Sequence, residues 1–176
     1  MMYFRGAGVA LAAVLAPLTA IAELTLVQGA NNSARLEGRI DGYAMSVNCS
    51  ANWGHQGLAG FMIGPRDEDP DPALTGVSGF GFEFILPDNV PEEIAEGAAV
   101  WSDVEIEEFN DRLFWYVPID DTLTKLFAYS TALEVAFTSR TGPVNLTMAM
   151  DRPDGDLVGR TGQAWLGLHQ ICQDKR

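Results

Sequence analysis

Positive charge is scarce in this chain. Its 176 residues include 11 Lys and Arg against 24 Asp and Glu, so the formal net charge is −13 with histidine neutral. This excess of negative charge repels phosphate backbones and anionic lipid head groups, which makes nucleic acids and membrane surfaces poor partners. The simplest interpretation is an acidic, soluble surface, and such a surface also attracts cations or a basic partner.

Long apolar runs are absent beyond the start of the chain, so no membrane insertion is expected for the body of the protein. Residues 7–18 are apolar but too short to cross a bilayer stably, and Arg5 precedes them. Residues 19–22 then supply the small-x-small pattern that signal peptidase reads. We predict a signal peptide over residues 1–22 and a mature chain that begins at Glu23 and works in the periplasm or is secreted.

The mature chain has the size of one domain. Removing 22 of the 176 residues leaves 154, enough to bury a hydrophobic core. Arg5 is the one charged residue in the leader, so the net charge of the mature chain becomes −14. No linker or internal repeat divides residues 23–176, and we predict a single exported β-rich domain.

Cysteine and histidine are also scarce. The two cysteines are Cys49 and Cys172, and the two histidines are His55 and His169. A zinc site needs three or four ligands. An even number of cysteines in an oxidising compartment indicates a disulfide, so the two cysteines are better explained as a bonded pair than as zinc ligands. We predict a bridge between Cys49 and Cys172, worth about 4–5 kcal/mol in the chain-entropy model. Two buried thiols are the alternative.

Alternation of apolar and polar residues with period two dominates the mature chain. It is clearest where Phe80, Phe82 and Phe84 share one face, while Gly81 and Glu83 take the other. Connections are short, and the spacing of parallel βαβ units is absent. The predicted fold class is mainly β: an antiparallel β-sandwich or partly open barrel of eight or nine short strands, with short helices and a C-terminal helix.

Two segments have helical spacing instead. Residues 120–127 place apolar side chains at positions 123, 126 and 127, and Asp121 or Thr122 is the expected N-cap. Residues 163–173 carry Leu168 and Cys172 near one face, which predicts the closing helix.

Residues 100–109 are predicted to form one strand, with Val100 facing the core. The opposite face of that strand then carries Trp101, Asp103, Glu105 and Glu107. An aromatic ring beside carboxylates suits sugar binding, and Asp103 with Glu105 suits acid–base cleavage of a glycosidic bond. The alternative is a solvated strand whose acids prevent edge pairing.

The densest acidic cluster lies in a proline-rich loop. Its alternate carboxylates are Asp67, Asp69 and Asp71. Their spacing is similar to the first half of a calcium loop, but Pro72 stands where the sharp glycine turn is needed and Ser78 where the final Glu is needed. An EF-hand is therefore excluded. A looser calcium site and a solvated loop tip are the two remaining interpretations, and no other cofactor is indicated.

No catalytic residues can be assigned, because no serine lies in a G-x-S-x-G context and no glycine loop resembles a phosphate cradle. We therefore predict a non-enzymatic exported β-domain with an envelope-associated or protein-interaction role and a protein partner in the cell envelope. One alternative is a carbohydrate- or calcium-binding module. Another is a hydrolase of envelope polymers that uses a carboxylate pair. The oligomeric state is left open.

The second half of the chain contains an ordered series of short motifs. Asp111-Arg112-Leu113 is followed by Val117-Pro118-Ile119, a helical segment and a hairpin, and residues 161–168 then lead to Cys172. Over residues 111–172 this series resembles the small periplasmic proteins of the invasion-associated locus B type, although those are richer in lysine and in cysteine. The resemblance implies an exported, non-enzymatic, β-rich protein and transfers no catalytic residues.

Overall fold

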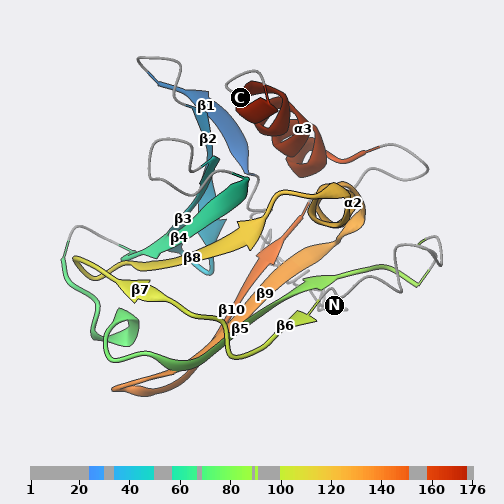
Figure 1. Cartoon of the computed structure of the whole chain (residues 1–176). Coiled ribbons are helices and arrows are strands. Elements are labelled where there is room, and N and C mark those ends of the chain that lie inside the picture. The colour runs from blue at the N-terminus through green and yellow to red at the C-terminus, as the bar shows by residue number, and fades with distance from the viewer. Residues whose placement is uncertain are drawn as a thin grey trace, which may run out of the picture.

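The computed structural model describes residues 24–29, 34–49, 57–66, 69–88, 90, 100–150 and 158–173. Within them the chain forms ten β-strands, two α-helices and one short 3₁₀ helix, arranged in two layers with the helices at one end (Figure 1). Two antiparallel sheets face each other without closing into a barrel, which confirms the predicted fold class. The leader predicted over residues 1–22 lies outside the described residues.

The larger sheet has six strands in the order β1-β2-β3-β4-β8-β7. These strands are β1 (Thr25–Gln28), β2 (Ala34–Ile40), β3 (Tyr43–Cys49), β4 (Leu58–Gly64), β8 (Leu113–Pro118) and β7 (Glu107–Glu108). Asp41 and Gly42 join β2 to β3 with φ of 47° and 86°. Positive φ at both central residues is what a two-residue hairpin turn requires, so the Asp-Gly pair sets the register here.

The smaller sheet has four strands in the order β10-β9-β5-β6. These strands are β10 (Gly142–Ala149), β9 (Ala132–Ser139), β5 (Ser78–Ile85) and β6 (Val100–Trp101), and the 3₁₀ helix η3 (Pro72–Leu74) precedes β5. A bulge between Ser78 and Gly81 interrupts the pairing of β5 with β9, and the register is regular from Gly81 onward.

The core lies between the sheets and is rich in aromatic rings. Phe61 from the larger sheet stacks on Trp115 with ring centroids 5.1 Å apart, and it meets Phe82 of the smaller sheet at 6.1 Å. The core extends to the helices, where Phe127 and Trp165 stack at 4.3 Å. Such aromatic pairs add about 0.5–1.5 kcal/mol beyond area burial. The alternating phenylalanines of β5 therefore face inward, as predicted.

Two helices cover one end of this core. In α2 (Asp121–Tyr129) the N-cap is Asp120, whose carboxylate accepts a hydrogen bond from Leu123 N at 2.8 Å. The predicted caps, Asp121 and Thr122, were wrong, because Asp120 has the extended backbone that a cap needs. The closing helix α3 (Arg160–Gln173) starts three residues earlier than predicted and packs on α2, β1, β2 and β3. None of the helices among the described residues is long and apolar enough to span a membrane.

The single strand predicted over residues 100–109 does not form. The strand β6 ends at Trp101, and β7 begins at Glu107 in the other sheet. Asp103 lies between them with φ of 54°, a left-handed conformation that interrupts the extended backbone of a regular strand. The chain therefore crosses from one sheet to the other within the segment whose alternation suggested one strand.

Candidate functional site

A hollow of about 230 Å³ opens on the outer face of the smaller sheet. All four strands of that sheet contribute to its lining. The lining residues that are not fully buried are Gly81, Glu83, Val100, Trp101, Ser102, Glu134, Ala136, Asn145 and Thr147. Their neighbours Phe82, Val135 and Leu146 are buried beneath them. Strand alternation thus divides β5, β9 and β10 into a core face and a face that lines the hollow.

Gly81 allows the wall of the hollow to form. A Cβ at this position would lie 2.8 Å from the carbonyl oxygen of Trp101 and 3.6 Å from Cα of Ser102. The following segment is held against β5 by a hydrogen bond from Val104 N to Phe80 O at 3.0 Å. The backbone after β6 therefore lies close over β5, where only a glycine leaves room for it.

Two carboxylates lie directly opposite each other in the hollow. Glu83 on β5 is the register partner of Glu134 on β9. Neither side chain has a hydrogen bond or an ion pair with any residue that the structure describes. Like charges at opposed positions of neighbouring strands destabilise a sheet, typically by a few tenths of a kcal/mol.

The same row continues across the whole sheet. Glu83 pairs with Val100 of β6, and Glu134 pairs with Thr147 of β10. Val100 is 55% exposed, so the prediction that it faces the core was wrong. An apolar side chain and a hydroxyl therefore flank the two carboxylates, and the hollow combines negative charge with an apolar border.

Trp101 turns the other way from its predicted orientation. Its ring stacks on Phe82, with centroids 4.5 Å apart and an angle of 11° between the planes. Trp101 is the register partner of Phe82, so its ring lies on the core side of the sheet. The residue is only partly buried and contributes to the edge of the hollow.

The predicted face of Trp101, Asp103, Glu105 and Glu107 does not exist. Asp103 and Glu105 are exposed in the loop between β6 and β7. Glu107 belongs to the larger sheet, where its backbone pairs with Phe114. The carboxylates and the tryptophan are thus distributed over two sheets and a connecting loop, which removes the geometry on which the sugar-site prediction depended.

One carboxylate of the acidic loop has a structural role. Asp71 caps η3 by accepting a hydrogen bond from Ala73 N at 2.9 Å, and it also forms a side-chain hydrogen bond with Tyr43. Asp69 is exposed, and Asp67 lies outside the described residues. No group of three or more metal-ligating side chains occurs in the part of the chain that the structure describes.

Burial of the phenol raises the pKa of Tyr43, and the charge of Asp71 raises it further. The guanidinium of Arg66 lies 4.3 Å over the same ring and acts in the opposite direction. This arrangement ties the acidic loop to the first residue of β3.

The outer face of the larger sheet carries exposed aromatic and cationic side chains. Phe109 is 66% exposed at the end of the β7–β8 hairpin. Asn110 and Asp111 form the turn, as predicted, with φ of 50° and 55°. Backbone hydrogen bonds of 3.0 and 3.1 Å join Phe109 to Arg112, so both side chains lie on the same side of a well-defined hairpin end.

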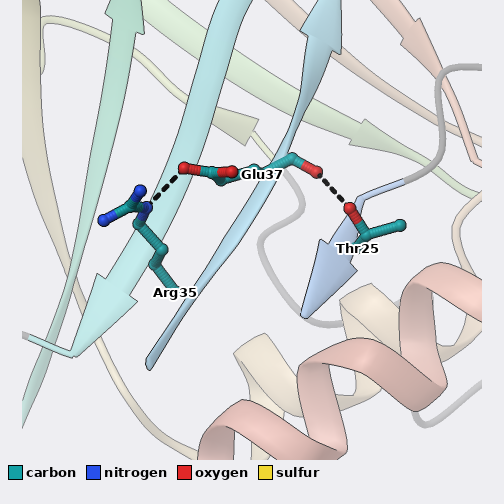
Figure 2. A network of polar contacts seen from close by, with 3 residues as sticks. All are labelled: Thr25, Arg35 and Glu37. Carbon is teal, nitrogen blue, oxygen red and sulfur yellow. Dashed lines mark hydrogen bonds and ion pairs between the residues drawn. The ribbon is translucent and has the colours of Figure 1, made fainter. Parts of the chain in front are cut away.

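The far end of this sheet is held by polar contacts. Arg35 forms an ion pair with Glu37, and the hydroxyl of Thr25 donates to the carbonyl oxygen of Glu37 at 3.2 Å (Figure 2). The hydrogen bond of Thr25 links β1 to β2 at the sheet edge, whereas the ion pair lies within β2. Exposed pairs of this kind contribute about 0–1 kcal/mol. They neutralise Arg35, whereas the guanidinium of Arg112 forms no ion pair with a described residue.

The predicted disulfide stays a prediction. Cys172 is half-buried near the end of α3 and packs on the core, whereas the side chain of Cys49 lies outside the described residues. The helix α3 contacts β3, the strand that ends at Cys49.

Sequence reasoning missed the pair of Glu83 and Glu134. Each was already identifiable as an outward residue from the alternation around it. Their direct opposition depends on the bulge in β5, which shifts the register by one residue. No family model, no curated protein and no solved structure matches this chain.

Proposed function

We propose that this protein is a non-enzymatic, exported β-domain of the cell envelope that binds a cationic side chain of a protein partner in the hollow of the smaller sheet. The opposition of Glu83 and Glu134 carries the proposal. Two like charges at paired positions reduce stability unless something between them is positive. A guanidinium or ammonium group from a partner supplies that charge.

The size and border of the hollow support the same occupant. Its volume of about 230 Å³ exceeds the roughly 150 Å³ of an apolar cavity that holds a benzene ring. A planar guanidinium with part of its aliphatic stem therefore fits. Val100 offers apolar contact to such a stem, while the carboxylates accept hydrogen bonds from its head. The net charge of −13 attracts basic partners from a distance.

The proposed export of the protein rests on its leader and its cysteines. The apolar leader over residues 1–22 supports export. A bridge between Cys49 and Cys172 is part of the proposal, because disulfides persist in oxidising compartments. One observation supports the pairing: α3 contacts β3, the strand that ends at Cys49.

The alternatives receive less support from the geometry. Trp101 stacks on Phe82 on the core side of the sheet, so it does not share a strand face with Asp103 and Glu105 as the sugar-site prediction required. Asp103 and Glu105 lie in a turning loop rather than on a strand face, so the acid–base pair proposed for a hydrolase loses its scaffold. Asp71 is engaged as a helix cap and as a partner of Tyr43 rather than as a metal ligand.

A titration followed by NMR tests the proposal. The probe is a blocked pentapeptide that carries one Phe and one Arg, and the control peptide has Gln in place of Arg. We expect saturable shifts of the backbone amides of Gly81, Glu83, Glu134 and Ala136 with the first peptide and none with the control. The double variant Glu83→Gln/Glu134→Gln should weaken binding roughly tenfold or more, since it removes both charges.

The matched control is Glu105→Gln/Glu107→Gln, which has the same net charge but leaves the lining of the hollow intact. We expect it to bind like the unmodified protein, apart from a small loss of long-range attraction. Equal binding by both double variants, or shifts that map elsewhere, would refute the proposed site.

A further inference from the structure

The hairpin of β7 and β8 presents an aromatic and a cationic group side by side. Phe109 and Arg112 are opposed residues of the hairpin, and opposed residues project to the same side of a sheet. Phe114 follows two residues after Arg112, so it shares this face, which is the outer face of the larger sheet. Phe114 is half-buried, whereas Phe109 and Arg112 are exposed.

Arg112 is held in place and shares its face with the carboxylate of Glu107, the register partner of Phe114. A Cβ added to Gly64 would meet Cγ and Nε of Arg112 at 3.6 and 3.7 Å, so the arginine stem lies along β4. Its guanidinium forms no ion pair among the described residues. Aromatic and arginine side chains are the types most enriched at the centres of protein interfaces.

The hollow offers the complementary features on the opposite face of the sandwich. It has two carboxylates without a cationic partner among the described residues, Glu83 and Glu134, and an exposed apolar residue, Val100. Resting on the function proposed above, we infer that the partner is a second copy of this chain: Arg112 of one copy enters the hollow of the next, with Phe109 against Val100.

Because the two surfaces lie on different sheets, the contact is heterologous. Each copy uses its larger sheet toward one neighbour and its smaller sheet toward the other, so the contact propagates in one direction unless it closes into a ring. One hairpin end against one hollow makes a small interface, and such interfaces are weak and transient. Both copies carry the same negative net charge, so long-range repulsion opposes this local contact between opposite charges. The expected behaviour is weak association that increases steadily with protein concentration.

Two complementary variants test this arrangement by sedimentation equilibrium. The first, Phe109→Ser/Arg112→Ser, loses the aromatic and cationic groups but keeps the hollow. The second, Glu83→Lys/Glu134→Lys, loses the hollow's charge but keeps the projecting groups. We expect the mature protein to associate, each variant alone to be monomeric, and an equimolar mixture to form a heterodimer and nothing larger.

The mixture gives a dimer because one intact hairpin meets one intact hollow and no further pair remains. Circular dichroism checks the fold of each variant. If a variant does not fold, the milder substitution Arg112→Gln or Glu134→Gln is used in its place. Each Gln variant should then weaken association roughly tenfold. A mature protein that stays monomeric at millimolar concentration, or folded variants that do not associate when mixed, would overturn the inference.

The outcome is separable from the function proposed above. Binding of the arginine peptide without self-association leaves the cationic site intact and excludes a second copy as its occupant. Self-association that does not depend on Arg112 or on Glu134 also excludes this contact.

Discussion

Asp41 Oδ2 accepts a hydrogen bond from the backbone N–H of Thr147 at 2.7 Å, across 106 residues of sequence. The contact joins the β2–β3 turn of the larger sheet to the edge strand of the smaller one. In an antiparallel edge strand every second N–H points away from the paired neighbour. Pro143 and Thr147 are four residues apart, so both occupy such outward positions on β10. Thr147 N–H is bonded to Asp41 and proline has no N–H, so few donors remain for pairing with another chain.

Replacing Asp41 should therefore separate its two roles. Asp41→Gly keeps a residue suited to φ of 47° but removes the acceptor, and it should lower the free energy of unfolding by about 1 kcal/mol. Asp41→Asn tolerates the same backbone and keeps an acceptor oxygen, so its stability should stay near that of the unmodified chain. Urea denaturation measures both. Equal stability of the two variants would show that the contact contributes nothing.

The two glycines of α3 give a second matched pair. A Cβ at Gly162 would lie 3.0 Å from both Phe127 O and Ala128 Cα, backbone atoms that cannot yield. Gly162→Ala should lower stability by about 1–3 kcal/mol, because α3 must move away from α2. At Gly167 the new Cβ meets only the end of the Leu26 side chain.

Gly167→Ala should then be neutral or stabilising, by up to about 1 kcal/mol from helix propensity. Thermal unfolding of both variants checks the pair. The packing of α3 on α2 is described wrongly if Gly162→Ala is the more stable of the two.

Alkaline pH should weaken the fold through Tyr43. Burial raises its pKa above the ordinary 10.0, with a further increase from Asp71, so the folded state retains the proton to higher pH than the unfolded state. The stabilisation is fully present below pH 10 and is lost as the pH rises through the raised pKa. Burial also raises the pKa of Tyr116, with Glu107 adding to the shift, and this gives the same sign.

Tyr43→Phe tests this assignment. The variant should show a shallower loss of stability above pH 10 in urea unfolding, because one of the two responsible groups is absent. It should also be less stable at neutral pH, since the hydrogen bond with Asp71 is lost. An unchanged alkaline slope would assign the effect to other groups.

The predicted bridge has a direct chemical test. The mass of the mature protein, measured with and without a reductant, should differ by two hydrogens if Cys49 and Cys172 are bonded. Cys49→Ser/Cys172→Ser should then lose about 4–5 kcal/mol of stability, the entropy of so long a closed loop. Equal stability of the reduced and oxidised chains would contradict a structural role.

Local pattern was sufficient for most of the fold. The alternation of Phe80, Phe82 and Phe84 identified β5 and its inner face, and turn residues such as Asn110-Asp111 marked a hairpin end. These features depend on neighbours in sequence. Period two was misleading at residues 100–109, because a crossover between sheets can begin and end with strand-like residues.

The candidate site required information that no local window contains. Glu83 and Glu134 are opposed only because a bulge sets the register of two strands that are distant in sequence. Trp101 faces inward because its partner Phe82 does, which is a cross-strand relationship. Alternation shows which face a residue is on, but pairing decides what it meets.

Urea unfolding with and without the arginine peptide tests the central claim most directly. At a peptide concentration ten times its dissociation constant, the unmodified protein should gain about 1.4 kcal/mol. Glu83→Gln/Glu134→Gln should start a few tenths of a kcal/mol more stable, because the repulsion is relieved. Since its binding is at least tenfold weaker, it should gain at most about 0.4 kcal/mol from the same peptide concentration. A double variant that is no more stable and gains as much from the peptide as the unmodified protein would contradict the account.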